Sequence, residues 1–120
     1  MSRSVLLQLA RDSIQEVLEA QRNIDKESLF VKQPLLKEPI SVTVNIYIED
    51  ELRGTSKTEE MPTTLLEEIV RHAKKAVFED VNYSPLTSSE YLSCEVELLL
   101  QTPDGVIGER DPSILKTHTI

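Results

Sequence analysis

Arg53 and Gly54 are the neighbouring residues in this sequence whose types best suit ligand binding. The guanidinium group of an arginine is a planar fork that matches a carboxylate or a phosphate. A glycine beside it would allow the backbone to turn sharply. Two interpretations follow. We favour a buried or half-buried bridge in which Arg53 binds an acid and holds the turn, because such forks are more often structural; the alternative is a site for an anionic ligand.

Cys94 is the single cysteine, which excludes a disulfide within the chain and a metal site made of several cysteines. It is in register with Val96, Leu98 and Leu100, the apolar face of a predicted strand. A thiol in that position behaves as a small buried hydrophobe. We therefore predict that Cys94 is chemically inert.

His72 follows Glu68 by four residues, a spacing that places both side chains on one face of a helix. The other histidine, His118, lies in the C-terminal tail, so a metal site is disfavoured and a partly exposed histidine at the helix edge is expected.

Two carboxylates in one cleft would suit acid–base chemistry. Most acids, Glu68 included, lie on predicted solvated faces. The sequence has neither a Ser-His-Asp spacing nor a glycine-rich phosphate loop.

Length and charge restrict the function classes further. The 120 residues fit one domain, 1–120, and the net charge of -8 repels phosphate backbones, so nucleic-acid binding is not expected. No apolar run approaches the roughly 20 residues of a membrane span. The N-terminus lacks the pattern of a signal peptide, and the expected location is the cytoplasm. No motif indicates a cofactor.

Two amphipathic helices are predicted to position these residues. The first covers 4–22, stops at Asn23 and has Arg11 on its solvated face. The second covers 64–77 and opens at Thr64, whose hydroxyl and the carboxylate three residues later have the spacing of a capping box.

Alternating apolar residues predict two strands, 42–49 and 94–101. Asp50 and Glu51 break the first strand, Leu52-Arg53-Gly54 re-enters an ordered segment, and a polar turn is expected from Thr55 onward. The shorter predicted features are an irregular connection over 24–40, where Pro34 and Pro39 exclude a helix, a helical turn over 87–92, a turn over 102–105, and a returning strand from Val106 that Pro112 ends. The resulting fold class is α+β, an antiparallel sheet with the two main helices packed on one face.

Several segments, taken in order, resemble the AMMECR-type domain family. They are Leu7-Gln8-Leu9-Ala10-Arg11-Asp12-Ser13-Ile14, Val42-Thr43-Val44, Leu52-Arg53-Gly54, Ala73 to Ala76, Asp80-Val81-Asn82-Tyr83-Ser84-Pro85-Leu86 and Glu95-Val96-Glu97-Leu98-Leu99. In the family, Cys-Ile-Gly follows Leu-Arg-Gly, whereas this chain has Thr55-Ser56-Lys57. Thiol chemistry at that position therefore does not carry over. Family members also continue well past position 120.

The resemblance implies a compact α+β domain with no firmly assigned activity. It also places the loop that contains Asp80 near the Leu-Arg-Gly segment. We therefore expect Asp80 to be the acid beside Arg53, with Glu95 as the second choice, and Arg53, Gly54 and Asp80 to be the binding residues if a ligand binds.

Two functions remain open. The first is a non-enzymatic interaction or accessory protein, and the second is a small enzyme that acts on an anionic substrate through Arg53 and a nearby carboxylate. We also expect a homodimer, because strand 42–49 would pair with a second copy if it lay at a sheet edge, and because apolar residues precede it. These residues are Leu29, Phe30, Leu35, Leu36 and Ile40.

Overall fold

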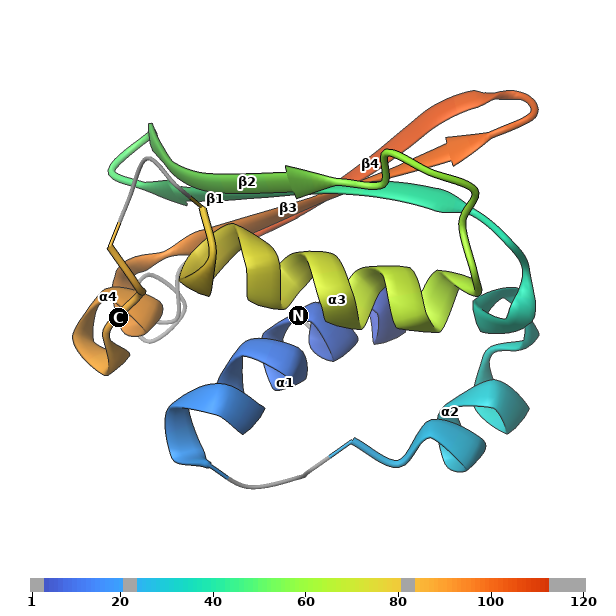
Figure 1. The fold of residues 1–120 in the computed structure, drawn as a ribbon, viewed down its shortest axis with the longest axis horizontal. Helices are drawn as coiled ribbons and strands as arrows, with labels where there is room; N and C mark the ends of the chain where they lie inside the picture. The colour runs from blue at the N-terminus through green and yellow to red at the C-terminus, as the bar shows by residue number, and fades with distance from the viewer. Residues whose placement is uncertain (1–3, 21–23, 81–83, 113–120) are drawn as a thin grey trace.

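A four-stranded antiparallel sheet with helices on one face forms the framework of the protein (Figure 1). The computed structural model describes residues 4–20, 24–80 and 84–112. The strands are β1 (Ser41–Ile48), β2 (Glu51–Lys57), β3 (Glu95–Thr102) and β4 (Gly105–Asp111), in the spatial order β2-β1-β3-β4. The predicted α+β class is confirmed.

β1 lies in the middle of the sheet, between β2 and β3. Its apolar residues Val42, Val44 and Ile46 are buried, as the alternation predicts. Pairing of this strand with a second copy required it to lie at an edge, and that condition is not met, because it pairs on both sides. The described edges of the sheet are β2 and β4.

β2 returns from β1 through a tight turn at Glu49 and Asp50, both of which have positive φ. Two such residues fit the turn type that matches the twist of a β-hairpin. The strand then continues through Lys57, so the polar turn expected from Thr55 is strand instead. Pairing with β1 stabilises this polar segment, and no apolar alternation marked it in the sequence.

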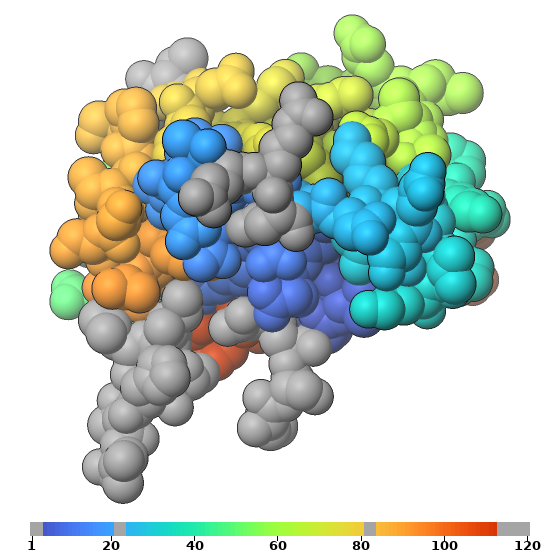
Figure 2. All heavy atoms as spheres, turned by 90° about the horizontal axis from the view of Figure 1, so that it is seen from below, coloured from blue at the N-terminus to red at the C-terminus, as the bar shows by residue number. Residues whose placement is uncertain are grey.

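Helix α3 (Leu65–Phe78) packs across β1 and β2 and carries much of the core. Thr64 caps it by accepting a hydrogen bond from the amide of Glu67 at 3.2 Å. α1 (Val5–Glu19) packs against α3 and also contacts β3 and β4, so both main helices lie on one face of the sheet (Figure 1); Figure 2 shows α1 beside α3 from below. No helix in the described ranges is long and apolar enough to cross a membrane.

α1 begins after Ser4, whose side chain caps the amide of Leu7, and ends when Ala20 adopts the left-handed conformation. The stop predicted at Asn23 lies outside the described residues. Arg11 was expected on the solvated face, and this was wrong, because its side chain is fully buried. It lies at the border of the apolar stripe, where Asp111 and several backbone carbonyls surround it.

Residues 24–40 contain two short helices where none was expected. α2 (Lys26–Lys32) is capped by Asp25, and the 3-10 helix η1 (Pro34–Lys37) starts at Pro34. A proline is tolerated at the first position of a helix, where its missing N–H has no partner to lose. Leu36 is fully buried and Leu29, Phe30 and Ile40 pack against the core, so most of the apolar surface expected here is covered.

α4 (Ser88–Ser93) and the β3–β4 hairpin complete the described fold and confirm the predicted helical turn and returning strand. Thr87 and Glu90 form a full capping box at the start of α4. Cys94 follows α4 directly and is fully buried.

Candidate functional site

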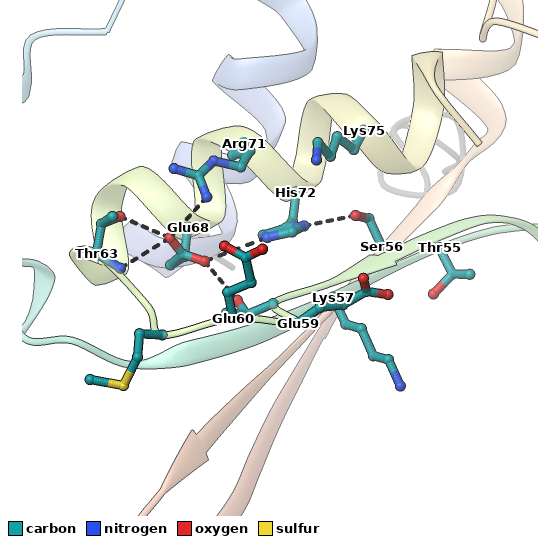
Figure 3. Close-up of a pocket in the computed structure, with 12 residues that line it drawn as sticks. Thr55, Ser56, Lys57, Glu59, Glu60, Thr63, Glu68, Arg71, His72 and Lys75 are labelled. Atoms are coloured by element: carbon teal, nitrogen blue, oxygen red, sulfur yellow. Dashed lines mark hydrogen bonds and ion pairs between the residues drawn. The ribbon is translucent and has the colours of Figure 1, made fainter. Parts of the chain in front are cut away.

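A groove lies between the edge strand β2 and helix α3 (Figure 3). Its volume is about 770 Å³. One wall is formed by residues 55–60, the end of β2 and the start of the loop that follows it. Glu68, Arg71, His72 and Lys75 of α3 form the other wall. An edge strand beside a helix is therefore the frame of the site.

Glu68 is a fully buried carboxylate at the loop end of the groove. Its oxygens accept hydrogen bonds from the hydroxyl of Thr58 at 2.8 Å and from the hydroxyl and amide of Thr63 at 2.8 and 3.2 Å. Burial alone would raise the pKa of Glu68, but these hydrogen bonds outweigh burial and lower it. The group is therefore an ionised acceptor, and its prediction as a solvated residue was wrong.

His72 lies one turn further along α3 and links Glu68 to β2. Its Nε2 is 3.5 Å from Oε1 of Glu68, and its Nδ1 is 2.7 Å from Oγ of Ser56. Because an ionised carboxylate can only accept, we assign the proton to Nε2, and Nδ1 then accepts from the Ser56 hydroxyl. Burial lowers the pKa of His72 more than the charge of Glu68 raises it, and the imidazole is neutral at pH 7.

Charged residues of both signs lie around the Ser56, His72 and Glu68 side chains. Arg71 and Lys75 lie on α3, whereas Glu59 and Glu60 lie on the loop after β2. Such a rim suits a polar ligand that carries both charges. Among the described residues, no group of three His, Cys, Asp or Glu side chains is placed to hold a metal ion.

Arg53 lies outside this groove, at an irregularity where β2 has one more residue than β1. An extra residue in a strand re-aims its side chain, and Arg53 reaches α4. Its Nε and Nη2 donate to the two carboxylate oxygens of Glu90 at 3.0 and 3.2 Å, and Nη2 also donates to the carbonyl of Ser84 at 2.8 Å. Arg53 lowers the pKa of Glu90 more than any other neighbour.

The half-buried bridge expected for Arg53 is therefore present, but its acid is Glu90 and not Asp80 or Glu95. Glu90 is at the capping position of α4, a local motif that does not reveal its distant partner. Glu95 instead accepts from Nε of Arg110 at 2.8 Å. Asp80 does lie beside the Leu-Arg-Gly segment, where it accepts from the amide of Thr55 at 3.1 Å.

Gly54 is required for close packing and not for a turn. A Cβ at this position would lie 2.0 Å from the carbonyl oxygen of Ala76, a backbone atom of α3. The glycine therefore lets the helix approach the edge strand. That approach sets the distance between the two walls of the groove.

Cys94 belongs to a second buried polar cluster, around Arg11. Nε of Arg11 donates to Asp111 at 2.6 Å, and Nη2 donates to the carbonyls of Cys94 and Pro112 at 2.9 and 3.0 Å. Burial raises the pKa of the Cys94 thiol, although the nearby guanidinium acts in the opposite direction. A buried, protonated thiol agrees with the predicted lack of reactivity.

The cluster of Ser56, His72 and Glu68 side chains was not predicted from the sequence. The spacing of Glu68 and His72 was visible, but Ser56 fell in a segment interpreted as a turn. Alternation of the small residues Gly54, Ser56 and Thr58 was the available signal, since a strand turns alternate side chains to one face.

Comparisons with known proteins agree with the architecture. A family model described as AMMECR1 matches residues 7–113. The crystal structure of an uncharacterized protein from Pyrococcus horikoshii superposes with a TM-score of 0.70 and 26% sequence identity. The match covers 82% of this chain and 50% of that chain, so this chain spans about half the length of that protein. A search of curated proteins finds no match.

Proposed function

The chain belongs to the AMMECR1 family, and we propose that it acts as an interaction or accessory protein that binds an extended peptide along the edge of β2. The observation that carries the proposal is the groove between an edge strand and a helix. Extended peptides commonly bind such grooves by adding a strand to the sheet, with main-chain hydrogen bonds giving affinity and side-chain pockets giving specificity.

The backbone of β2 is oriented for strand addition. The amide of Thr58 donates to the carbonyl of Val42 in β1 at 2.9 Å, which fixes the alternation of the strand. The amides of Thr55 and Lys57 consequently point away from β1. Asp80 takes the first of them, and Lys57 presents the next one along the exposed part of the strand.

Charge on the two walls selects the peptide. Arg71 and Lys75 favour an acidic residue facing α3, and Glu59 and Glu60 favour a basic residue facing the loop. The net charge of -8 additionally favours approach of a peptide with a basic excess. The expected ligand is thus an extended segment with one acidic and several basic side chains.

Two other readings receive less support. An enzyme that binds an anionic substrate through Arg53 would need the guanidinium to be accessible. Two of the guanidinium nitrogens instead donate to Glu90. A homodimer would use the same β2 edge, with a second copy of the strand in place of a peptide. The dimer therefore becomes an outcome of the test.

The test uses a fluorescein-labelled octapeptide of alternating Thr and Val, with Lys replacing two Thr residues and Glu replacing one. Binding is followed by fluorescence anisotropy and by amide chemical shifts. Lys57→Pro removes the outward N–H, and an edge strand tolerates proline there. Lys57→Ala is the matched control, because it removes the same charge but keeps the N–H.

We expect shifts at residues 55–60 and binding that Lys57→Pro weakens at least about fivefold, the worth of one hydrogen bond. Lys57→Ala should keep most of the affinity. Shifts confined to β4, equal binding by both variants, or no shifts at millimolar peptide would each overturn the proposal. A dimer in sedimentation that dissociates in Lys57→Pro would assign the edge to a second copy and also overturn it.

A further inference from the structure

We propose that Ser56 is an activated nucleophile and that the groove carries a site for acyl transfer from esters or thioesters. Three observations combine. The Ser56 hydroxyl is 2.7 Å from an imidazole nitrogen, the other nitrogen faces a buried carboxylate, and all three groups line a cavity of about 770 Å³. This inference does not rest on peptide binding.

The arrangement meets the geometric requirements for nucleophilic catalysis by a hydroxyl. A serine is a weak nucleophile until a neighbouring base accepts its proton, and the base must be held in the correct tautomer by a third group. Glu68 holds the proton of His72 on Nε2, which leaves the lone pair of Nδ1 directed at Ser56. Thr58 and Thr63 in turn fix both oxygens of Glu68.

The base is also in the right protonation state. Because His72 is buried, its pKa is below the ordinary value of 6.5, and the imidazole accepts a proton at neutral pH. Lys75 and Arg71 face it from α3 and oppose its protonation, while Glu68 favours it. The structural alternative is a hydrogen-bonded strut between β2 and α3, which requires no reactivity at Ser56.

The reaction balances without a cofactor. Oγ of Ser56 attacks the acyl carbon as its proton moves to Nδ1 of His72, and negative charge develops on the carbonyl oxygen in a cavity that the cationic residue Lys75 helps to line. The bond to the leaving alcohol or thiol then breaks, and that group takes the proton from His72. Water releases the acid from acyl-Ser56 by the same route.

The probes are a fluorophosphonate, which traps active serines, and p-nitrophenyl acetate, and the readout is the mass of the intact protein followed by peptide mapping. We expect one adduct on Ser56 that is absent in Ser56→Ala. Labelling should slow by at least about 100-fold in His72→Gln, the usual contribution of a general base. Ser88→Ala, an exposed serine on α4, is the matched control and should label like the wild type.

A pH profile separates catalysis from a structural contact. The labelling rate should be constant above pH 7 and fall with the protonation of one group as the pH drops below 6.5. Circular dichroism of each variant confirms folding. No adduct at Ser56, or a rate in folded His72→Gln equal to the wild-type rate, would overturn the proposal.

Discussion

Replacing Arg11 by Met should destabilise the protein more than any change to a surface charge. The Arg11 side chain is fully buried and donates to Asp111, Cys94 and Pro112. Met fills much of the space but removes every donor, which leaves a buried carboxylate without its cation. Breaking a buried pair from one side costs about 3–5 kcal/mol. A domain of this size has about 5–15 kcal/mol in total.

The assay is urea unfolding followed by circular dichroism. With a slope of about 2 kcal/mol per molar, a loss of about 4 kcal/mol lowers the midpoint by about 2 M. Lys26→Met is the control, because the Lys26 and Glu67 side chains are 50% and 41% exposed and such a pair contributes at most about 1 kcal/mol. The double variant Arg11→Met/Asp111→Asn should recover part of the loss. If Arg11→Met unfolds within 0.5 M of the control, by the same slope of about 2 kcal/mol per molar, the reasoning is refuted.

Three further predictions follow from the packing and the pKa shifts. Gly54→Ala should lower the free energy of unfolding by more than about 2 kcal/mol, because the new methyl meets a backbone atom of Ala76. Gly108→Ala should lower it less, because its methyl meets a side-chain methyl that can move. Urea unfolding compares the two variants. Cys94 should react slowly with a thiol dye in the native protein and at once in urea, and fast native labelling would contradict its burial. His72 has a lowered pKa, so its stabilising contribution is complete above pH 6.5 and is lost as the pH falls further. The free energy of unfolding, measured from pH 7.5 to 5, should therefore fall with pH, and it should fall less in His72→Gln. Equal pH dependence in the two proteins would contradict this.

The periodic elements were predictable because their signal is local. β1, α3 and β3 each carry apolar residues at the spacing of their own geometry, and burial follows that spacing. The cap at Thr64 was equally predictable, since a cap depends on neighbours three residues apart. The end of β2 was harder to predict, because pairing with β1 stabilises a polar segment whose only pattern is an alternation of small residues.

The burial of Arg11 and the acid partner of Arg53 were missed because the residues that bind them are distant in the sequence. Arg11 and Asp111 are separated by 100 residues, and each alone has the character of a surface group. The bridge from Arg53 to Glu90 spans 37 residues and joins a strand to a short helix. A helical pattern assigns a charged residue to the solvated face unless something reveals its partner, and a single sequence does not.

The two buried polar clusters differ in one respect that bears on function. Around Arg11, the hydrogen bonds connect α1 to the ends of α4 and β4. The guanidinium donates to acceptors of the protein itself, as expected of a structural role. Around His72, the chain from Glu68 ends on a hydroxyl that faces the groove. Both clusters incur the cost of desolvating polar groups. The Arg11 cluster holds three elements together. The His72 cluster instead directs the Ser56 hydroxyl at a groove that a ligand can enter. The groove, and not the arginine cluster, is therefore where we expect chemistry.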